Sequence, residues 1–188
     1  MTVSKTAQSK DLSFRTANLS DIAHLEKLVH LAYRGGKATV AWKNEDHLVK
    51  GPRITAAELK ELVESNTAAI MLAEMPGNGH SELVGCVLVE DHGTDAHIGL
   101  LAVSPDCQNM GIGKKLICAA ETYAHHHFKQ TIAKMCVLSG REELLGWYKS
   151  LGYKETGKTE PFPGADSGLQ TANTDAHFIE ISKNIQAR

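Results

Sequence analysis

Residues 101–116 read LAVSPDCQNMGIGKKL, and this stretch decides how the rest of the chain is interpreted. An apolar run suited to a strand leads through a short polar loop to a helix whose start contains Gly111 and Gly113. The first amides of a helix have no partner within it, and the helix dipole makes them attractive to an anion such as a pyrophosphate. Glycine lets a ligand approach the backbone without meeting a Cβ atom. The stretch therefore predicts an anion-binding turn between a strand and a helix.

Two nucleotide-binding motifs do not fit this loop. The dinucleotide-binding fingerprint needs G-x-G-x-x-G and an acidic residue about 20 positions later, and neither is in place here. A P-loop needs G-x-x-x-x-G-K-[ST], whereas Gly113 is followed by two lysines. Taken alone, the motif fits a coenzyme site and a merely tight turn equally well. The surrounding sequence is needed to distinguish these two interpretations.

The pattern of apolar residues around the loop predicts alternating strands and helices. The capping box T-x-x-E marks a helix start at Thr55, and the short turn at residues 92–95 requires the strands that it joins to be antiparallel. The expected strands cover residues 12–16, 68–75, 83–90, 96–103, 132–138, a stretch from about 153, and 177–183; the expected helices begin at a cap on Asn18 or Ser20 and at Thr55, and cover residues 114–129 and 142–150. This order, β-α-α-β-β-β-α-β-α-β-β, is typical of an α/β layered domain with a mixed sheet.

The composition is that of an ordinary globular protein of 188 residues, 42% of them hydrophobic and 22% charged. A chain of this length suits one domain, and we expect a flexible tail over residues 1–11 and a single domain over residues 12–188. The formal net charge of −2 argues against a nucleic-acid or anionic-membrane binder, because such binders need a basic face. No apolar run approaches the ~18 residues of a membrane span, and the polar N-terminus lacks a signal peptide. We therefore expect a cytoplasmic protein that binds neither membranes nor nucleic acid.

The sequence predicts no metal site. The four cysteines are widely spaced and form no CxxC pair; Cys86, Cys118 and Cys136 lie in apolar runs typical of small core residues. Cys107 is interpreted as a loop thiol without a paired histidine. The run 125–127 is His-His-His, but consecutive helix positions point about 100° apart and cannot converge on one ion.

A second motif lies downstream, where residues 143–153 read ELLGWYKSLGY. The glycine loop followed by a helix, a strand and this W-Y-x-x-x-G-Y segment resembles the GNAT superfamily, the acetyl-coenzyme A-dependent N-acetyltransferases. The resemblance extends over residues 12–183 and is strongest over residues 103–153. It implies a GNAT-like layered fold, with a mixed, mostly antiparallel sheet of about seven strands, a V-shaped splay in that sheet, and helices on both of its faces.

The resemblance also implies where acetyl-coenzyme A, the acyl donor, binds. The amides from about Met110 to Lys114 would hold the pyrophosphate, and the main chain of the preceding strand would pair with the pantetheine arm. A bulge in that strand would splay it from the strand at residues 132–138 and open a slot. The expected coenzyme-binding residues are Leu101, Ala102, Val103, Gln108, Asn109, Met110, Gly111, Ile112, Gly113 and Lys114.

Two residues are the expected catalytic groups. Tyr148 matches the family's usual general acid, which would protonate the leaving thiolate; it could instead be a packing aromatic beside Trp147. His97 falls where several members place a base glutamate, and an imidazole with an unperturbed pKa near 6.5 suits a base; it could instead be a surface or structural histidine. A backbone N–H of the splayed strand, with that of Ala102 as the candidate, would stabilise the oxyanion. The other candidate bases are Glu90, Asp91, His92 and Asp95.

The expected activity is transfer of an acetyl group to a primary amine of a small molecule by direct attack in a ternary complex, by a monomer or homodimer. A protein N-terminus or lysine is an alternative acceptor. Arg141 stands where many family members have Asn, so a catalytically silent coenzyme A-binding module of the same fold is a second alternative. In this family the segment that contains Trp42, Glu45, Asp46 and His47 borders the acceptor site.

Overall fold

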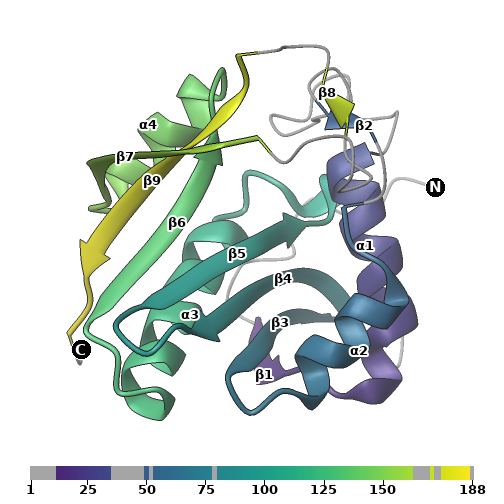
Figure 1. Cartoon of the computed structure of the whole chain (residues 1–188). Helices are drawn as coiled ribbons and strands as arrows, with labels where there is room; N and C mark the ends of the chain where they lie inside the picture. Colours follow the sequence, from purple (N-terminus) through teal and green to yellow (C-terminus); the bar gives the residue numbers. More distant parts are fainter. Residues whose placement is uncertain are drawn as a thin grey trace.

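The computed structural model describes residues 12–34, 49–50, 53–77, 80–162, 170–171 and 175–186. A seven-stranded sheet lies between two layers of helices (Figure 1). One layer consists of α1 (Ile22–Arg34) and α2 (Ala56–Glu64), and the other of α3 (Ile112–His127) and α4 (Glu142–Ser150). The expected α/β layered fold with helices on both faces is confirmed.

The sheet has the strand order β1-β3-β4-β5-β6-β9-β7. Every neighbouring pair is antiparallel except β5 and β6, which are parallel. The sheet is therefore mixed and mostly antiparallel, as the sequence predicts. Its strands are β1 (Ser13–Thr16), β3 (Ala68–Pro76), β4 (Ser81–Asp91), β5 (Ala96–Val103), β6 (Ile132–Leu138), β7 (Lys154–Pro161) and β9 (His177–Asn184).

Alternation of side chains along the central strands builds two separate cores. In β3, Ile70 and Leu72 pack with the α1 and α2 side of the sheet, whereas Ala69, Met71 and Ala73 pack with the α3 and α4 side. Successive strand residues point to opposite faces, so a strand covered on both faces has to be apolar throughout. This explains why β3, β4 and β5 read as nearly continuous apolar runs rather than as alternating ones.

A β-bulge interrupts β5. The register with β4 shifts between Cys86 and Leu88, so that Leu100 and Leu101 together stand opposite Val87. Leu100 has a φ of 45°, in the left-handed region that side chains with a Cβ rarely adopt. A bulge bends its strand and increases the local twist, and here it turns the second half of β5 away from β6.

The strands β5 and β6 consequently diverge. Their described pairs are limited to Ala96 with Ala133 and His97 with Lys134, at the beginning of both strands. Figure 1 shows the two arrows separating from this point onward. The V-shaped splay expected between these strands is confirmed.

Local sequence signals account for the helix starts. The side chain of Thr55 accepts a hydrogen bond from the Glu58 amide, and the Glu58 carboxylate accepts one from the Thr55 amide. Asn18 and Asp21 form the same reciprocal box at the short 3-10 turn η2 (Leu19–Asp21) that leads into α1. The two expected helix starts therefore carry the capping chemistry that their sequences indicate.

A two-stranded sheet was not expected from the sequence. It pairs β2 (Val49–Lys50) with β8 (Gln170–Thr171) in antiparallel fashion, and each strand is too short to show a period-2 pattern. The expected tail over residues 1–11 and the segment from Trp42 to His47 lie outside the described residues. None of the described helices is long and apolar enough to cross a membrane.

A buried charged cluster ties the end of the sheet to α3. The Glu121 carboxylate accepts hydrogen bonds from the Lys183 ammonium at 2.6 and 2.8 Å and from the Tyr153 hydroxyl at 3.0 Å. The pKa of Tyr153 is raised by burial and by the nearby Glu121 carboxylate, so this tyrosine is a neutral hydrogen-bond donor. Because all three groups are paired, the cluster satisfies polar atoms that would otherwise be costly to bury.

Candidate active site

The glycine loop folds as a turn that presents helix amides. After β5, the short 3-10 turn η3 (Pro105–Cys107) leads to Asn109, which has a φ of 63°, and to Gly111, the N-cap of α3, with a φ of 76°. The left-handed φ at the N-cap explains the requirement for glycine there, since a Cβ would be strained even though no atom lies within 4 Å of its position. The first amides of α3, from Ile112 onward, have no partner within the helix and follow an N-cap with open space beside it, as an anion site requires.

Gly113 faces a different side of the loop from the expected one, and a Cβ atom there would make only ordinary van der Waals contacts. A Cβ at this position would lie 3.5 Å from the Trp147 ring and 3.9 Å from Val103. The missing side chain therefore faces the interior, where α3 begins against α4, rather than the face on which an anion would bind. Gly113 brings the start of α3 close to the helix that carries Tyr148.

The polar main-chain groups of β5 point alternately toward β4 and toward the slot. Ser104 donates its amide to the Val84 carbonyl at 2.8 Å, and Ala102 pairs with Cys86, so Ala102 also bonds toward β4. Its neighbours Leu101 and Val103 point the opposite way, because the bonding direction alternates along a strand. Ala102 is therefore the wrong choice for an oxyanion donor, and the slot-facing groups belong to Leu101 and Val103.

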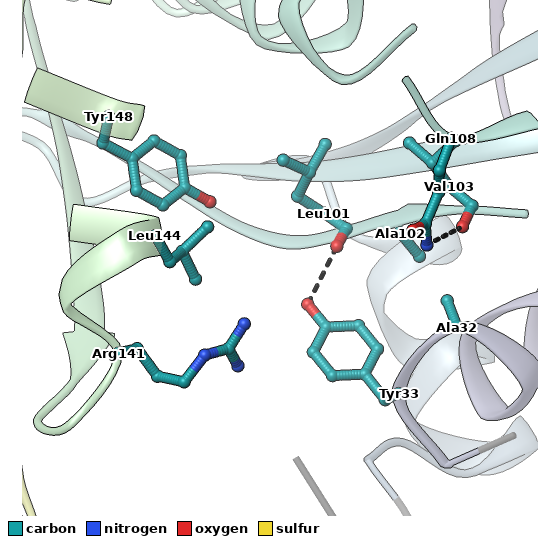
Figure 2. Close-up of a pocket in the computed structure, with 9 residues that line it drawn as sticks. All are labelled: Ala32, Tyr33, Leu101, Ala102, Val103, Gln108, Arg141, Leu144 and Tyr148. Atoms are coloured by element: carbon teal, nitrogen blue, oxygen red, sulfur yellow. Dashed lines mark hydrogen bonds between the residues drawn. The ribbon is translucent and has the colours of Figure 1, made fainter. Parts of the chain in front are cut away.

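Two side chains confirm which carbonyl groups face the slot. The Leu101 carbonyl accepts a hydrogen bond of 2.9 Å from the Tyr33 hydroxyl, and the Val103 carbonyl accepts one of 3.4 Å from the Gln108 amide (Figure 2). A small cavity of about 30 Å³ lies beside them; it is lined by Ala32, Tyr33, Leu101, Ala102, Val103, Gln108, Arg141, Leu144 and Tyr148. The coenzyme loop and the slot thus meet at the end of β5.

Tyr148 stands at the junction of two cavities. Its side chain is buried and packs against Trp147 and Tyr153 in edge-to-face geometry. Figure 2 shows the hydroxyl group directed across the small cavity toward Leu101. Tyr148 also lines a second, larger cavity of about 300 Å³ between β5, β6 and β9. The residue therefore packs as an aromatic side chain and also presents its hydroxyl group to the slot.

The lining of the larger cavity distinguishes His97 from the other candidate bases. His97 lines it, whereas Glu90, Asp91, His92 and Asp95 do not. Asp95 is instead bound to the Lys134 ammonium at 2.8 Å, and Asp91 accepts a hydrogen bond of 2.6 Å from the Gln130 amide. Burial, and then the proximity of His92, lower the pKa of His97, so its imidazole is neutral at pH 7 and its lone pair is available.

Two further residues with side chains that can bind a metal ion lie close to His97. Glu90 is its direct partner across the β4–β5 pair, and His92 follows in the connecting turn, with its ring 5.4 Å from that of His97. One nitrogen or oxygen atom of each of the three residues lies within 4.8 Å of the other two, a spacing that could hold a metal ion. No local sequence pattern indicates this group, because its members come together only across the hairpin.

Several cavity-lining residues were not predicted. Glu160 of β7 lines the larger cavity together with Arg53, which precedes α2, and Tyr33 of α1. The sequence gives these residues no motif of their own, and they converge only because β7 and the start of α2 both border the splay. Within the described residues, Glu160 is the carboxylate that lines this cavity.

Two of the cysteines are poorly suited to act as nucleophiles. Burial raises the pKa of the Cys86 thiol to about 12, and Cys107 also has a raised pKa, first from burial and then from the Glu82 and Asp106 carboxylates. Both shifts oppose thiolate formation. Cys86 is a buried core residue as expected, whereas Cys118 and Cys136 are half-buried, and Cys136 lines the larger cavity.

Comparisons with known proteins agree with this architecture. Residues 66–155 match the family model of the acetyltransferase (GNAT) domain. A search of curated proteins gives no match. Among solved structures, spermidine N-acetyltransferase from Vibrio cholerae in complex with CoA and spermine has a TM-score of 0.67 at 15% identity, over 94% of this chain and 97% of that one.

Two other solved structures are similar to the same extent. Ard1 from Thermoplasma volcanium has a TM-score of 0.66 at 17% identity, over 94% of this chain and 99% of that one. YncA, a putative acetyltransferase from Salmonella typhimurium with its cofactor acetyl-CoA, has a TM-score of 0.67 at 14% identity, over 95% and 96% of the two chains. At such identities these likenesses establish the fold. The matched family model spans the glycine loop and the Tyr148 helix, so residues 66–155 of this chain are similar to the acetyltransferase (GNAT) domain.

Proposed function

We propose that this acetyltransferase transfers an acetyl group from acetyl-coenzyme A to a primary amine of a small molecule, by direct attack in a ternary complex. The observation that carries the proposal is the slot between β5 and β6, which runs from the glycine loop to a cavity of about 300 Å³ with Tyr148 at the junction. Solved structures of similar fold that hold CoA with spermine, or acetyl-CoA, support the choice of donor.

The donor would bind along β5. The pyrophosphate would accept hydrogen bonds from the amides at Met110 to Lys114, and the pantetheine arm would pair with the slot-facing groups of Leu101 and Val103. Gln108 and Asn109 would form the wall of this channel. The thioester would then lie beside the bulge, where Tyr148 and the larger cavity meet.

The acceptor would enter through the larger cavity. An ammonium has no lone pair with which to attack a thioester, and an alkyl amine has a pKa of about 10.4, so a base has to remove a proton near pH 7. His97 lines this cavity with a lowered pKa and would take the proton, directly or through water. The neutral amine nitrogen would then attack the thioester carbonyl carbon.

Two groups would act on the tetrahedral intermediate. A slot-facing amide of β5, from Leu101 or Val103, would donate a hydrogen bond to the oxyanion. As the carbon–sulfur bond breaks, the Tyr148 hydroxyl would give its proton to the departing thiolate. The products would be an N-acetylated amine and coenzyme A with a free thiol.

Thermal unfolding tests donor binding. We expect acetyl-coenzyme A at 100 times its Kd to stabilise the protein by about 2.7 kcal/mol, which raises Tm by roughly 5–10 °C for a domain of this size. NADH and ATP at the same concentration should give no comparable shift, since the loop matches neither of their motifs. Absence of a shift at saturating acetyl-coenzyme A would contradict the proposed function.

Substitution of His97 tests the base. We expect His97→Gln to lower kcat/KM at pH 7 by about 100-fold, the lower end of the range for general base catalysis, because glutamine cannot accept the proton. The melting temperature and the acetyl-coenzyme A shift should stay close to those of the parent protein. His126→Gln, on the exposed end of α3, is the matched control. A His97→Gln enzyme with full turnover would assign the base elsewhere, with Glu160 the next candidate.

A further inference from the structure

The hairpin between β4 and β5 brings together three side chains that can bind a metal ion. Glu90 and His97 stand directly opposite each other in the β4–β5 pair, and opposite residues of an antiparallel pair point to the same face of the sheet. His92 follows in the turn, with its ring 5.4 Å from that of His97. One oxygen or nitrogen atom of each residue lies within 4.8 Å of the other two. The three groups therefore converge beside the larger cavity, which His97 lines.

The turn that carries His92 is closed by hydrogen bonds. The His92 amide donates one of 3.0 Å to the Asp95 carbonyl, and the Gly93 amide donates one of 3.0 Å to the Asp91 carboxylate. Gly93 has a φ of 82°, in the left-handed region that glycine adopts readily. Asp91 also accepts a hydrogen bond of 2.6 Å from the Gln130 amide. The exposed imidazole of His92 takes part in none of these bonds.

Charged residues beside this group have partners of their own. Asp95 binds the Lys134 ammonium at 2.8 Å, so the positive charge opposite His97 in β6 is compensated by a carboxylate. Within the described parts of the chain, the Glu90 carboxylate and the imidazoles of His92 and His97 make no hydrogen bond and no ion pair. Glu90 and His97 are half-buried, where polar side chains usually have a partner. A bound cation would be a partner for all three groups.

The combination of ligands suits a transition-metal ion. Two imidazoles and one carboxylate are found in zinc sites with three protein ligands and one water molecule, whereas magnesium and calcium prefer oxygen ligands throughout. Three atoms within 4.8 Å of one another have a common point about 2.8 Å or less from each, and zinc bonds to nitrogen and oxygen measure about 2.0–2.2 Å. A closure of less than about 1 Å would therefore bring all three atoms to bonding distance. Rotation of the exposed His92 side chain can provide part of it.

We propose that Glu90, His92 and His97 bind one divalent transition-metal ion, with zinc as the ion that matches these ligands, and that the bound ion inhibits acetyl transfer. A neutral imidazole has one nitrogen lone pair. A coordinate bond from His97 to the ion would occupy the lone pair that accepts the proton of the amine. The metal site is argued from the hairpin alone, whereas the inhibition rests on the proposed function. The sequence by itself predicts no metal site.

Titration of the full-length, tag-free and metal-free protein tests the metal site. We expect isothermal titration calorimetry to give one tightly bound Zn²⁺ per chain, and Co²⁺ to give the visible absorption bands of a four-coordinate site. His92→Gln and Glu90→Gln should each weaken Zn²⁺ binding by about 100-fold or more, because each removes one of three protein ligands. His126→Gln, on the exposed end of α3, is the matched control and should leave the affinity unchanged. Mg²⁺ and Ca²⁺ should not displace Zn²⁺.

Acetyl transfer to an amine that the parent enzyme accepts, with and without Zn²⁺, tests the inhibition. The N-acetylated amine is measured by chromatography, because the thiol of the product coenzyme A itself binds zinc. We expect saturating Zn²⁺ to lower kcat/KM of the parent by about 100-fold, the lower end of the contribution of a general base. The ratio of the values with and without Zn²⁺ is compared within each variant, and at the same Zn²⁺ concentration it should approach one in His92→Gln.

Three results would overturn the inference. If Zn²⁺ binds to His92→Gln and Glu90→Gln as tightly as to the parent, the ion lies elsewhere and the metal site is wrong. If Zn²⁺ binds at the hairpin without changing turnover, the inhibition is wrong. If the parent transfers no acetyl group to any amine, the proposed function fails and the inhibition with it, whereas calorimetry and the Co²⁺ spectrum still decide whether the hairpin binds an ion.

Discussion

Replacement of Tyr148 by Phe is expected to lower kcat by about 100-fold or more, the range in which general acid catalysis contributes. The substitution removes one hydroxyl group and keeps the ring that packs between Trp147 and Tyr153. The thiolate would then leave without a proton donor directed at it. Steady-state rates at saturating acetyl-coenzyme A and saturating amine measure the effect, and KM for both substrates should change little because the hydroxyl acts on the leaving group.

The neighbouring aromatic residue provides a matched control for this substitution. Tyr153→Phe removes the same atom from a tyrosine whose hydroxyl bonds to Glu121 at 3.0 Å and lines neither cavity. We expect it to cost about 1 kcal/mol of stability and to leave kcat within twofold. A Tyr148→Phe enzyme whose kcat equals that of Tyr153→Phe would show that Tyr148 is a packing residue only.

The largest expected effect on stability comes from Lys183→Met. This change leaves the Glu121 carboxylate, whose side chain is 10% exposed, without its cation. An unpaired buried charge costs about 3–5 kcal/mol, which corresponds to a fall in Tm of roughly 10 °C for a domain of this size. Differential scanning calorimetry of the metal-free and ligand-free protein measures it.

Apolar replacement of the whole cluster should restore much of the loss. In the triple variant Glu121→Met, Lys183→Met, Tyr153→Phe, no polar group of the cluster remains buried without a partner, and such replacements are often neutral. That result would mean that the charged groups contribute to stability only by pairing with one another. A single Lys183→Met variant that melts within 1 °C of the parent would mean that solvent reaches Glu121 and compensates for the lost ammonium.

The sequence predicts the elements well because their signals are local. The Thr55–Glu58 capping box, the turn at residues 92–95 and the apolar runs of β3, β5 and β6 each lie within a few residues of the feature that they specify. The same holds for the start of α3, where Gly111 takes up the left-handed φ that a helix N-cap of this shape requires. The pairing of β2 with β8 joins segments that are distant in the chain, and no local pattern predicts it.

The candidate site is predictable only on its donor side. The glycine loop is contiguous, so the sequence alone indicates an anion site there. The groups of the larger cavity come from separate elements: Tyr33 from α1, His97 from β5 and Glu160 from β7. Their convergence depends on how far β5 and β6 separate, which follows from one bulge and not from residue type. For the same reason the direction of the Ala102 amide could not be inferred before the register with β4 was known.

The bulge at Leu100 and Leu101 also affects the mechanics of the whole molecule. It divides the sheet into two panels, β1-β3-β4-β5 and β6-β9-β7, that are joined by the residue pairs at one end of β5. A donor that pairs with the slot-facing main chain of Leu101 and Val103 would occupy the place of a neighbouring strand along this half of β5. A bound donor would then connect the two panels along the part of β5 that does not pair with β6.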